Sequence, residues 1–293
     1  MSVSEGSARA AEIPGEPMAL PQSVAFSRTG VHFLVVPVRL NDAIDTKFIL
    51  DTGIGVNLLS QKLCDQLGLR LTGTASGRRM SGQEVTFPTT RVPALRFAGH
   101  RAEDTLAGVF DFEERNFGVH PSISGFLSLD FFRSRPFTID YPAGVVTLDD
   151  EASLSARRAR GVRVPLRLDE QGPAIDVFAE MSLGDGLSAS ILIDTGSPAL
   201  TLDERYMASL GILKGEPDTR QVQGADETGH PYVRYLASVP VRIGPGVSPS
   251  SHQRPITTKF QAIIHDGLIG DEYLRDFVVS FDLPNREMIL GSP

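Results

Sequence analysis

Cysteine is nearly absent from this sequence. Cys64 is the only cysteine in 293 residues, so no disulfide can form within the chain and the redox compartment stays open. No stretch approaches the ~18 consecutive apolar residues of a membrane-spanning helix, so no membrane span is expected. The formal net charge is −8. Phosphate binding needs clustered Lys and Arg, so nucleic acid is not an expected partner either.

Several signatures of catalysis are also missing. The six histidines show no metal-ligand spacing such as H-E-x-x-H, so neither a metal nor another cofactor is expected. No G-x-S-x-G, P-loop or dinucleotide-binding fingerprint occurs. Cys64 has no neighbouring histidine to activate it, which indicates a small buried residue and not a nucleophile.

The first 21 residues show no periodicity, which predicts a flexible tail. Ala8-Arg9-Ala10 has the pattern of a signal-cleavage site, but no apolar segment precedes it. A periplasmic or secreted location is therefore expected if a signal peptide has been trimmed, and a cytoplasmic one otherwise.

Glycine and proline, in contrast, are abundant. They number 28 and 20 and make up roughly 16% of the chain, against a usual ~12%. This excess predicts many turns and therefore many short strands. With 41% hydrophobic residues, the chain has enough apolar side chains for a real core.

The sequence is an internal repeat. A shift of 143 places residues 51–53 (Asp-Thr-Gly) on residues 194–196 (Asp-Thr-Gly), and a shift of 142 aligns 125–148 with 267–290. Between these blocks each half carries Gly-x4-Gly. We therefore predict two homologous lobes, 22–150 and 161–293, joined by a linker at 151–160.

The linker region contains a run of basic residues: Arg157, Arg158, Arg160 and Arg163. Mixed charge without alternation predicts an exposed, solvated connector. A nucleic-acid patch is the less favoured alternative, because no aromatic residue interleaves with the arginines.

Within each lobe, period-2 patterns predict strands joined by hairpin turns at Asn41-Asp42 and at residues 184–186. Ser60 and Asp203 occupy positions where an N-cap would begin a short helix. Gly68 and Gly211 are expected to end these helices. The Gly-x4-Gly segments precede alternating runs, which predicts two further hairpin tips, at 77–82 and 224–229.

The two Asp-Thr-Gly motifs are the most informative feature. One copy alone would be read as an ordinary turn. Each copy, however, follows at least three apolar residues, 48–50 and 191–193. A charge at the end of a buried strand is costly unless it is paired or used. A pseudo-twofold axis between the lobes would bring Asp51 and Asp194 face to face, where they would share one proton and activate a water.

On these motifs the sequence resembles the pepsin/retropepsin superfamily of aspartic proteases. The apolar-apolar-Asp-Thr-Gly motif occurs at 49–53 and 192–196, and the downstream apolar-apolar-Gly signature fits 266–274. In the first lobe, 124–132 has Ser128 where that family has Gly. The resemblance implies an all-β fold: two retropepsin-like β-barrel lobes related by a pseudo-twofold axis, with short helices, like a fused retropepsin dimer of bacterial type.

The resemblance also implies roles for individual residues. Asp51 and Asp194 would be the catalytic dyad, Thr52 and Thr195 would hydrogen-bond across the lobes, and the loops would further include Gly53, Gly196 and Ser197. The hairpins would be flaps over an extended polypeptide substrate, held as an added strand. Their candidate residues are Gly77, Arg78, Arg79, Met80, Ser81, Gly82, Gly224, Ala225, Asp226 and Gly229. A monomer is expected, because fusion of the lobes removes the need to dimerise.

Ile54 departs from the Ser or Ala that the family usually has after Asp-Thr-Gly. An apolar residue there is expected to raise the apparent pKa of the dyad. Ile54 and Ser128 both lie in the first lobe and leave two alternatives to an endopeptidase open. One is a catalytically silenced peptide-binding module, and the other is a protease-like scaffold.

Overall fold

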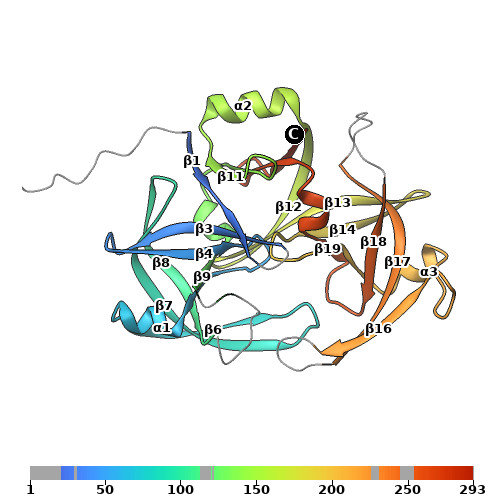
Figure 1. The fold of residues 1–293 in the computed structure, drawn as a ribbon, viewed down its shortest axis with the longest axis horizontal. Coiled ribbons are helices and arrows are strands. Elements are labelled where there is room, and N and C mark those ends of the chain that lie inside the picture. Colours follow the sequence, from blue (N-terminus) through green and yellow to red (C-terminus); the bar gives the residue numbers. More distant parts are fainter. Residues whose placement is uncertain are drawn as a thin grey trace, which may run out of the picture.

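The computed structural model describes residues 21–29, 32–112, 120, 122–225, 231–244 and 254–292. Strands dominate these residues and the helices are few and short, so the predicted all-β, two-lobe fold is confirmed (Figure 1). Closure of each lobe into a barrel stays a prediction.

The first lobe is made of strands with two short helical segments. Its elements are β1 (Gln22–Ala25), β2 (Ser27–Thr29), β3 (Phe33–Leu40), β4 (Ile44–Leu50), β5 (Asn57–Ser60), α1 (Gln61–Gln66), β6 (Leu71–Arg78), β7 (Glu84–Phe97), β8 (His100–Phe110), β9 (Ile123–Leu127), the 3-10 helix η1 (Leu129–Phe132), β10 (Phe137–Asp140) and β11 (Val145–Leu148). The order of elements around the Asp-Thr-Gly motif then recurs in the second lobe.

The second lobe follows a helix, α2 (Glu151–Arg160). Its elements are β12 (Val162–Gln171), β13 (Ala174–Gly184), β14 (Leu187–Ile193), β15 (Thr201–Asp203), α3 (Tyr206–Ser209), β16 (Arg220–Ala225), β17 (Pro231–Ile243), β18 (Arg254–Gln261), β19 (Gly267–Ile269), α4 (Asp271–Leu274), β20 (Val278–Asp282) and β21 (Glu287–Gly291). As in the first lobe, the strand before Asp-Thr-Gly pairs in parallel with a later strand: β4 with β9, and β14 with β19.

One antiparallel sheet joins the lobes, in the order β1-β11-β10-β20-β21-β12. At its middle, Thr138 of β10 pairs with Ser280 of β20, and their hydroxyl oxygens lie 2.7 Å apart. Beside them the rings of Phe137 and Phe281 stack with centroids 4.9 Å apart. Thr138 and Ser280 are equivalent positions of the repeat, so the pseudo-twofold axis passes between β10 and β20.

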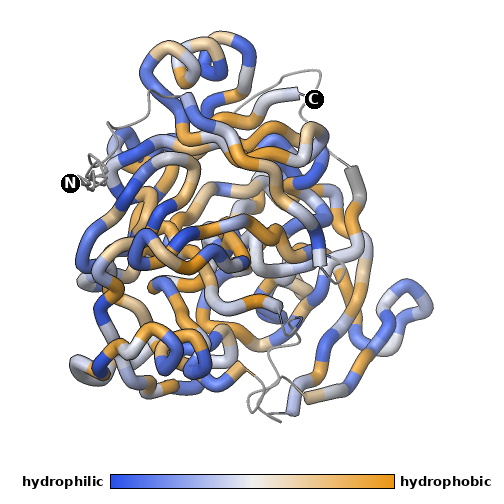
Figure 2. Tube along the Cα trace, turned by 60° about the vertical axis from the view of Figure 1, so that its left-hand side comes forward, coloured by the Kyte–Doolittle hydropathy of each residue, from blue (hydrophilic) through white to orange (hydrophobic). Residues whose placement is uncertain are grey.

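The predicted hairpin turns are confirmed. Asn41 and Asp42 connect β3 to β4 with φ of 50° and 55°, and Asp185 lies between two glycines with φ of 47°. Short polar side chains tolerate this left-handed region better than β-branched ones do, which is why such residues predict the turn. The turns bring the apolar faces of the strands into register, and Figure 2 shows hydrophobic segments running through the interior.

One of the two predicted helix caps is confirmed and the other is wrong. Ser60 caps α1, because its hydroxyl accepts a hydrogen bond from the Leu63 N–H at 3.2 Å. The second-lobe helix begins at Tyr206, not directly after Asp203. The Asp203 carboxylate instead accepts hydrogen bonds from the N–H groups of Arg205 and Ile263, both at 3.0 Å.

The segment predicted as a solvated connector is the helix α2. A capping box between Asp150 and Ser153 begins it, and Leu154 is buried. Its arginines pair with buried carboxylates: Arg157 Nε lies 3.2 Å from Asp149 Oδ1, and Arg158 Nε lies 2.8 Å from Glu287 Oε1. The basic run therefore ties the connector to the central sheet.

Candidate active site

The repeat places two aspartates at equivalent ends of buried strands. Leu50 and Ile193, the residues before them, have no exposed surface. The Asp51 N–H donates to the Leu127 carbonyl at 3.0 Å, and the Asp194 N–H donates to the Ile269 carbonyl at 2.9 Å. Each aspartate therefore leaves its strand in the same way, at the boundary between the lobes.

Two threonines cross that boundary. The N–H of Thr52 donates to the hydroxyl oxygen of Thr195, and the N–H of Thr195 donates to that of Thr52, both at 3.1 Å. Each hydroxyl in turn donates to a main-chain carbonyl of the other lobe, Thr52 to Ile193 at 2.6 Å and Thr195 to Leu50 at 3.0 Å. These four bonds hold the two loops against each other, in the arrangement that the resemblance implied.

The glycines let the two carboxyl groups approach. The N–H groups of Gly53 and Gly196 donate to Oδ1 of Asp51 and Asp194 respectively, both at 2.9 Å. A Cβ on Gly53 would lie 2.9 Å from the Asp194 Cβ, and one on Gly196 would lie 2.7 Å from Asp51 Oδ1. Each carboxyl group thus lies against the glycine of the opposite loop, and the two carboxyl groups are close enough to change each other's acidity.

Burial and proximity change the acidity of both groups. Asp51 is 8% exposed, and Asp194 is partly exposed. Burial raises the pKa of Asp51 to about 6. Burial, followed by the negative charge of Asp51, raises the pKa of Asp194 well above its usual value. Two facing carboxyl groups of this kind hold one proton between them in weakly acidic solution.

The residues that follow the two motifs differ in their contacts. Ile54 is partly buried and packs against the apolar cluster that includes Ile49, Phe87 and Phe126. The Ser197 hydroxyl donates to the Ala199 carbonyl at 3.3 Å. Its side chain therefore makes a turn contact inside the second-lobe loop, whereas Ile54, three residues after Asp51, joins an apolar cluster of the first lobe.

Ser128 and its second-lobe equivalent Gly270 mark a further asymmetry. A Cβ on Gly270 would collide with the carbonyl of Ser197, so that loop requires glycine. In the first lobe, Ser128 is buried, and its N–H donates to Asn57 Oδ1 at 2.9 Å. Asn57 was not predicted, because a lone asparagine at a strand start carries no recognisable signal.

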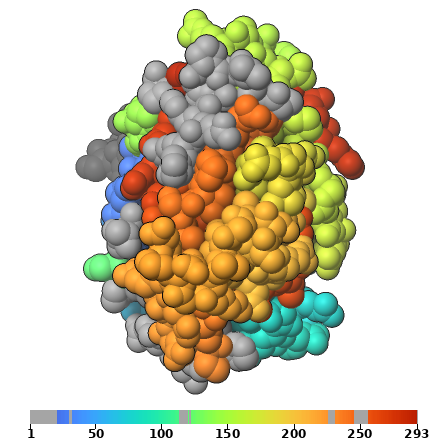
Figure 3. Space-filling view, turned by 90° about the vertical axis from the view of Figure 1, so that its right-hand side faces the viewer, coloured from blue at the N-terminus to red at the C-terminus, as the bar shows by residue number. Residues whose placement is uncertain are grey.

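The first-lobe hairpin reaches the second lobe. The Ile264 N–H donates to the Met80 carbonyl at 2.9 Å, and a Cβ on Gly82 would lie 3.1 Å from Ile264 Cγ2. The Met80 side chain packs against a small buried cluster made of Phe178, Leu192 and Leu268. Figure 3 shows the second-lobe side of the molecule, where the cyan first-lobe hairpin emerges at the lower edge.

The other hairpin residues predicted in the first lobe lie at or beside this tip. Gly77 and Arg78 end β6, and Arg78 lies opposite Glu84 of β7 in the antiparallel strand register. The Arg79 N–H donates to the Gln83 carbonyl at 2.9 Å, and Ser81 is partly buried. The predicted tip between two strands is therefore confirmed for the first lobe.

The second-lobe hairpin is described only along its strands. Gly224 and Ala225 end β16 and pair with Tyr232 and Pro231 of β17. A Cβ on Gly224 would lie 2.8 Å from the Tyr232 Cζ, so glycine leaves room for that ring. Two predicted site residues, Asp226 and Gly229, lie outside the described residues.

A further contact to the site was not predicted. His32, just before β3 of the first lobe, places Nε2 3.0 Å from the carbonyl oxygen of Gly196 in the second-lobe loop. Nearby, Arg28 crosses the same boundary and lies 2.9 Å from Asp271 Oδ1. A single histidine whose partner lies in the other half of the chain has no motif that could have revealed it.

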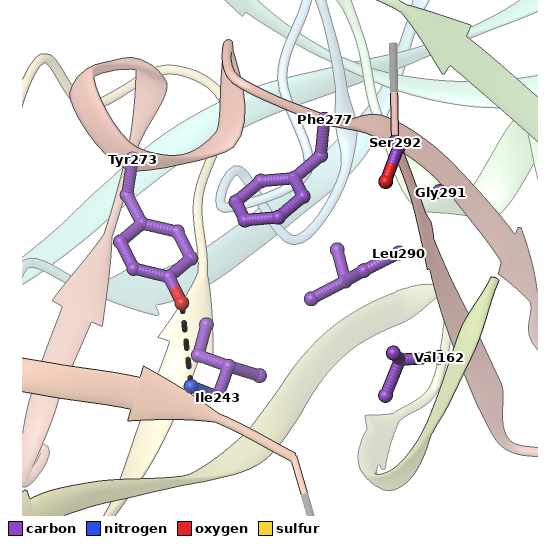
Figure 4. Close-up of a pocket in the computed structure, with 7 residues that line it drawn as sticks. All are labelled: Val162, Ile243, Tyr273, Phe277, Leu290, Gly291 and Ser292. Carbon is purple, nitrogen blue, oxygen red and sulfur yellow. Dashed lines mark hydrogen bonds between the residues drawn. The ribbon is translucent and has the colours of Figure 1, made fainter. Parts of the chain in front are cut away.

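A small apolar hollow lies elsewhere in the second lobe, with a volume of about 20 Å³. Figure 4 shows its lining, where the Ile243 N–H donates to the Tyr273 hydroxyl at 3.3 Å. Its lining includes neither dyad residue. Within the described ranges, no cluster of three or more His, Cys, Asp or Glu side chains could hold a metal ion, and no helix has the length and apolarity to cross a membrane.

A family model described as aspartyl protease matches residues 36–131, which confirms the resemblance in the first lobe. No curated protein matches the chain in sequence.

Two solved structures extend the likeness to both lobes. They are conglutin gamma, a basic 7S globulin from lupine seeds, and basic 7S globulin from soybean. Each is 12% identical, covers 93% of this chain and 95% of its own, and has a TM-score of 0.54. At this identity the likeness concerns the fold alone, which in these globulins is pepsin-like.

Proposed function

We propose that the chain is an aspartic endopeptidase whose catalytic dyad is Asp51 and Asp194. The single observation that carries this proposal is the packing of each carboxyl group against the glycine of the opposite loop, beside the crossed hydrogen bonds of Thr52 and Thr195. Two carboxyl groups that share one proton can act as a general base and a general acid at the same time, which the hydrolysis of an amide requires. Their location on rigid, mutually braced loops provides the pre-organisation that catalysis needs.

The chemistry follows from the shared proton. The ionised carboxylate takes a proton from a water molecule, whose oxygen attacks the carbonyl carbon of the peptide bond. The protonated carboxyl donates its proton to the carbonyl oxygen, which gives a tetrahedral gem-diol. The protonated carboxyl of the dyad gives its proton to the amide nitrogen, and the other carboxylate takes a proton from one gem-diol hydroxyl as the C–N bond breaks, which releases a carboxylic acid and an amine. The dyad ends with one proton, as it began.

The substrate in this proposal is an extended polypeptide held between the dyad and the first-lobe hairpin. Strand-like segments such as β6 and β7 present main-chain groups to an added strand. The hydrogen bond from Ile264 to Met80 closes this hairpin onto the second lobe. We infer that this contact opens when substrate enters, and that the second hairpin, with Gly224 and Ala225 at the end of β16, borders the opposite side of the substrate site. One chain supplies both carboxyl groups, so no second copy is needed to complete the dyad, and we propose that the active form is a monomer.

A peptide-binding module without catalysis is the second candidate. The observations that favour it are the apolar Ile54 after the first Asp-Thr-Gly motif and the altered first-lobe signature at Ser128. The two structurally similar proteins are moreover named as globulins, not as enzymes. In this alternative the cleft still receives an extended peptide, but no bond breaks.

A peptide-library digest across pH ~3–8, with the wild type and the variants Asp51→Asn and Asp194→Asn, distinguishes the candidates. Cleavage that either variant abolishes supports the endopeptidase. Binding of a statine-type transition-state analogue without cleavage of any peptide supports the binding module. If the wild type neither cleaves peptides nor binds the analogue, both candidates fail and only a scaffold role is left.

A further inference from the structure

The two catalytic loops are braced from opposite lobes by equivalent positions. The alignment that superimposes the two Asp-Thr-Gly motifs places His32 on Ile175, next to the starts of β3 and β13. The Ile175 N–H donates to the Gly55 carbonyl at 3.3 Å, from the second lobe to the first-lobe loop. In the opposite direction, His32 Nε2 lies 3.0 Å from the Gly196 carbonyl. A main-chain donor thus supports one loop and an imidazole supports the other.

We propose that His32 is a positioning residue for Asp194, and that its neutral imidazole donates the Nε2 hydrogen to the Gly196 carbonyl. This inference rests on the proposed function, since it assigns a role in the same site. It adds a residue that touches neither the substrate nor the dyad and that acts through the second-lobe loop.

The hydrogen bonds on either side of that carbonyl show how the effect would reach Asp194. The Gly196 carbonyl and the Ser197 N–H belong to one planar peptide unit. The Ser197 N–H donates to the Asp194 carbonyl at 3.1 Å, and the Gly196 N–H donates to the Asp194 carboxylate at 2.9 Å. The Gly196 N–H belongs to the preceding peptide unit, which is joined to this plane at the Gly196 Cα. Holding the Gly196 carbonyl from outside therefore restricts the rotation of Gly196 and helps to keep its N–H directed at the Asp194 carboxylate.

The surroundings of His32 favour its neutral form. The charged groups that face it are Arg28 of its own lobe and Asp271 and Lys259 of the second lobe. Burial is the largest influence and lowers the pKa of His32. The hydrogen bond to Gly196 and the charge of Asp271 act in the opposite direction, the charges of Lys259 and Arg28 lower the pKa further, and the net shift is downward. Its Nδ1 is buried and has no hydrogen-bond partner among the described residues. A neutral ring that carries its hydrogen on Nε2 leaves no N–H at Nδ1 without an acceptor.

This arrangement makes the two halves of the dyad unequal. The first-lobe loop is held by a peptide N–H, which does not titrate. The second-lobe loop is held by the side chain of His32, which a substitution can remove. Removing the imidazole should therefore change the pKa of Asp194 more than that of Asp51. It should also lower kcat more than it raises KM.

The test compares His32→Phe, which removes the donor and keeps a ring, with His32→Gln, whose amide can still donate. His120→Phe is the matched control, because His120 is exposed and its Nδ1 contacts only Ser122 in the described contacts. We expect His32→Phe to lower kcat about tenfold, the effect of one lost hydrogen bond, with KM nearly unchanged. His32→Gln restores most of the loss, and His120→Phe matches the wild type.

A second readout does not depend on activity. Carboxyl-carbon NMR of the folded protein follows the titration of both dyad residues, and imidazole-nitrogen NMR gives the tautomer of His32. We expect an Nε2–H tautomer, and in His32→Phe an upward shift of the Asp194 pKa that exceeds any shift for Asp51. A change of equal size at both residues, or none, overturns the proposal, as does a His32→Phe enzyme with wild-type kcat. If the wild type cleaves nothing, the endopeptidase proposal fails, and this NMR comparison still decides the role of His32.

Discussion

Thr52 and Thr195 exchange hydrogen bonds across the lobe boundary, each donating its N–H to the hydroxyl of the other at 3.1 Å. Both residues are 1% exposed, so water cannot replace a lost partner. The pair therefore links the stability of the fold to the geometry of the candidate site.

The first prediction concerns this pair. Thr52→Val keeps the shape but removes the hydroxyl, and it leaves the Thr195 N–H and the Ile193 carbonyl without their partner. We expect a loss of about 3 kcal/mol in the free energy of unfolding, because each unsatisfied buried group costs roughly 1–3 kcal/mol. Urea denaturation measures it. Thr52→Ser, which keeps the hydroxyl, is the control and should lose less than half as much; an equal loss would contradict the role of the hydroxyl.

The second prediction concerns the pH dependence of stability. The pKa of Asp51 is raised from 3.8 to about 6, and that of Asp194 is also raised, so the folded state binds more protons than the unfolded state between these values. The stability is thus present at low pH and is lost as pH rises through the folded-state pKa. Asp194→Asn removes one of the two charges and should be more stable than the wild type at pH 7, by on the order of 1–3 kcal/mol.

Thermal unfolding at several pH values checks this prediction. The advantage of Asp194→Asn should shrink toward pH 4, because protonation of the folded wild-type dyad removes the cost of its buried charges. Asp185→Asn, at an exposed turn of the same lobe, is the control. An advantage that does not change between pH 4 and pH 7 would refute the raised pKa of the pair.

The third prediction concerns Ile54. Ile54→Ser places a hydroxyl and room for water in the loop that carries Asp51, which favours the ionised carboxylate and should lower its pKa by about one unit. The acid side of the pH–rate profile then moves to lower pH. Ile54→Val keeps the apolar contact with the cluster around Phe126 and should leave the profile in place. Identical profiles for the two variants would show that Ile54 does not set the acidity of the dyad.

The fourth prediction concerns the closed hairpin. Met80→Ala removes most of the contact with Phe178, Leu192 and Leu268, and with it the main apolar support of the hydrogen bond from Ile264. The variant loses ~1.5 kcal/mol of the free energy that apolar burial contributes to the closed hairpin. The amide hydrogen of Ile264 should therefore exchange with solvent about tenfold faster. Met80→Leu preserves the apolar volume and should exchange like the wild type. Unchanged exchange in Met80→Ala would mean that the main-chain bond alone holds the hairpin.

Much of the site could be predicted because the repeat carries the information. Equivalent positions of the two halves must be related by the same axis as the lobes, so Asp51 and Asp194 are expected to face each other without any knowledge of the loops between them. The turn at Asn41-Asp42 was predictable for a different reason, since its positive φ angles restrict which residues fit.

The remaining features depend on long-range contacts that local patterns do not encode. The sequence around Asp203 predicts a helix cap, but one of its carboxylate oxygens accepts a hydrogen bond from the N–H of Ile263, which lies far along the chain. The helix α2 was missed because Leu154 is its only buried residue, so no apolar periodicity marks it. His32 was missed because its partner is a main-chain carbonyl, which leaves no trace in the sequence.

The central sheet determines which strand edge each half of the chain would expose if the halves were separated. Its middle strands β10 and β20 meet at the axis, with Thr138 opposite Ser280. An isolated half would therefore expose an open strand edge that fits a second copy of itself. A protein made of one half alone could cover this edge by pairing with a second, identical copy. Within a single chain the two halves need not be identical, and the equivalent positions Ile54 and Ser197 carry different side chains.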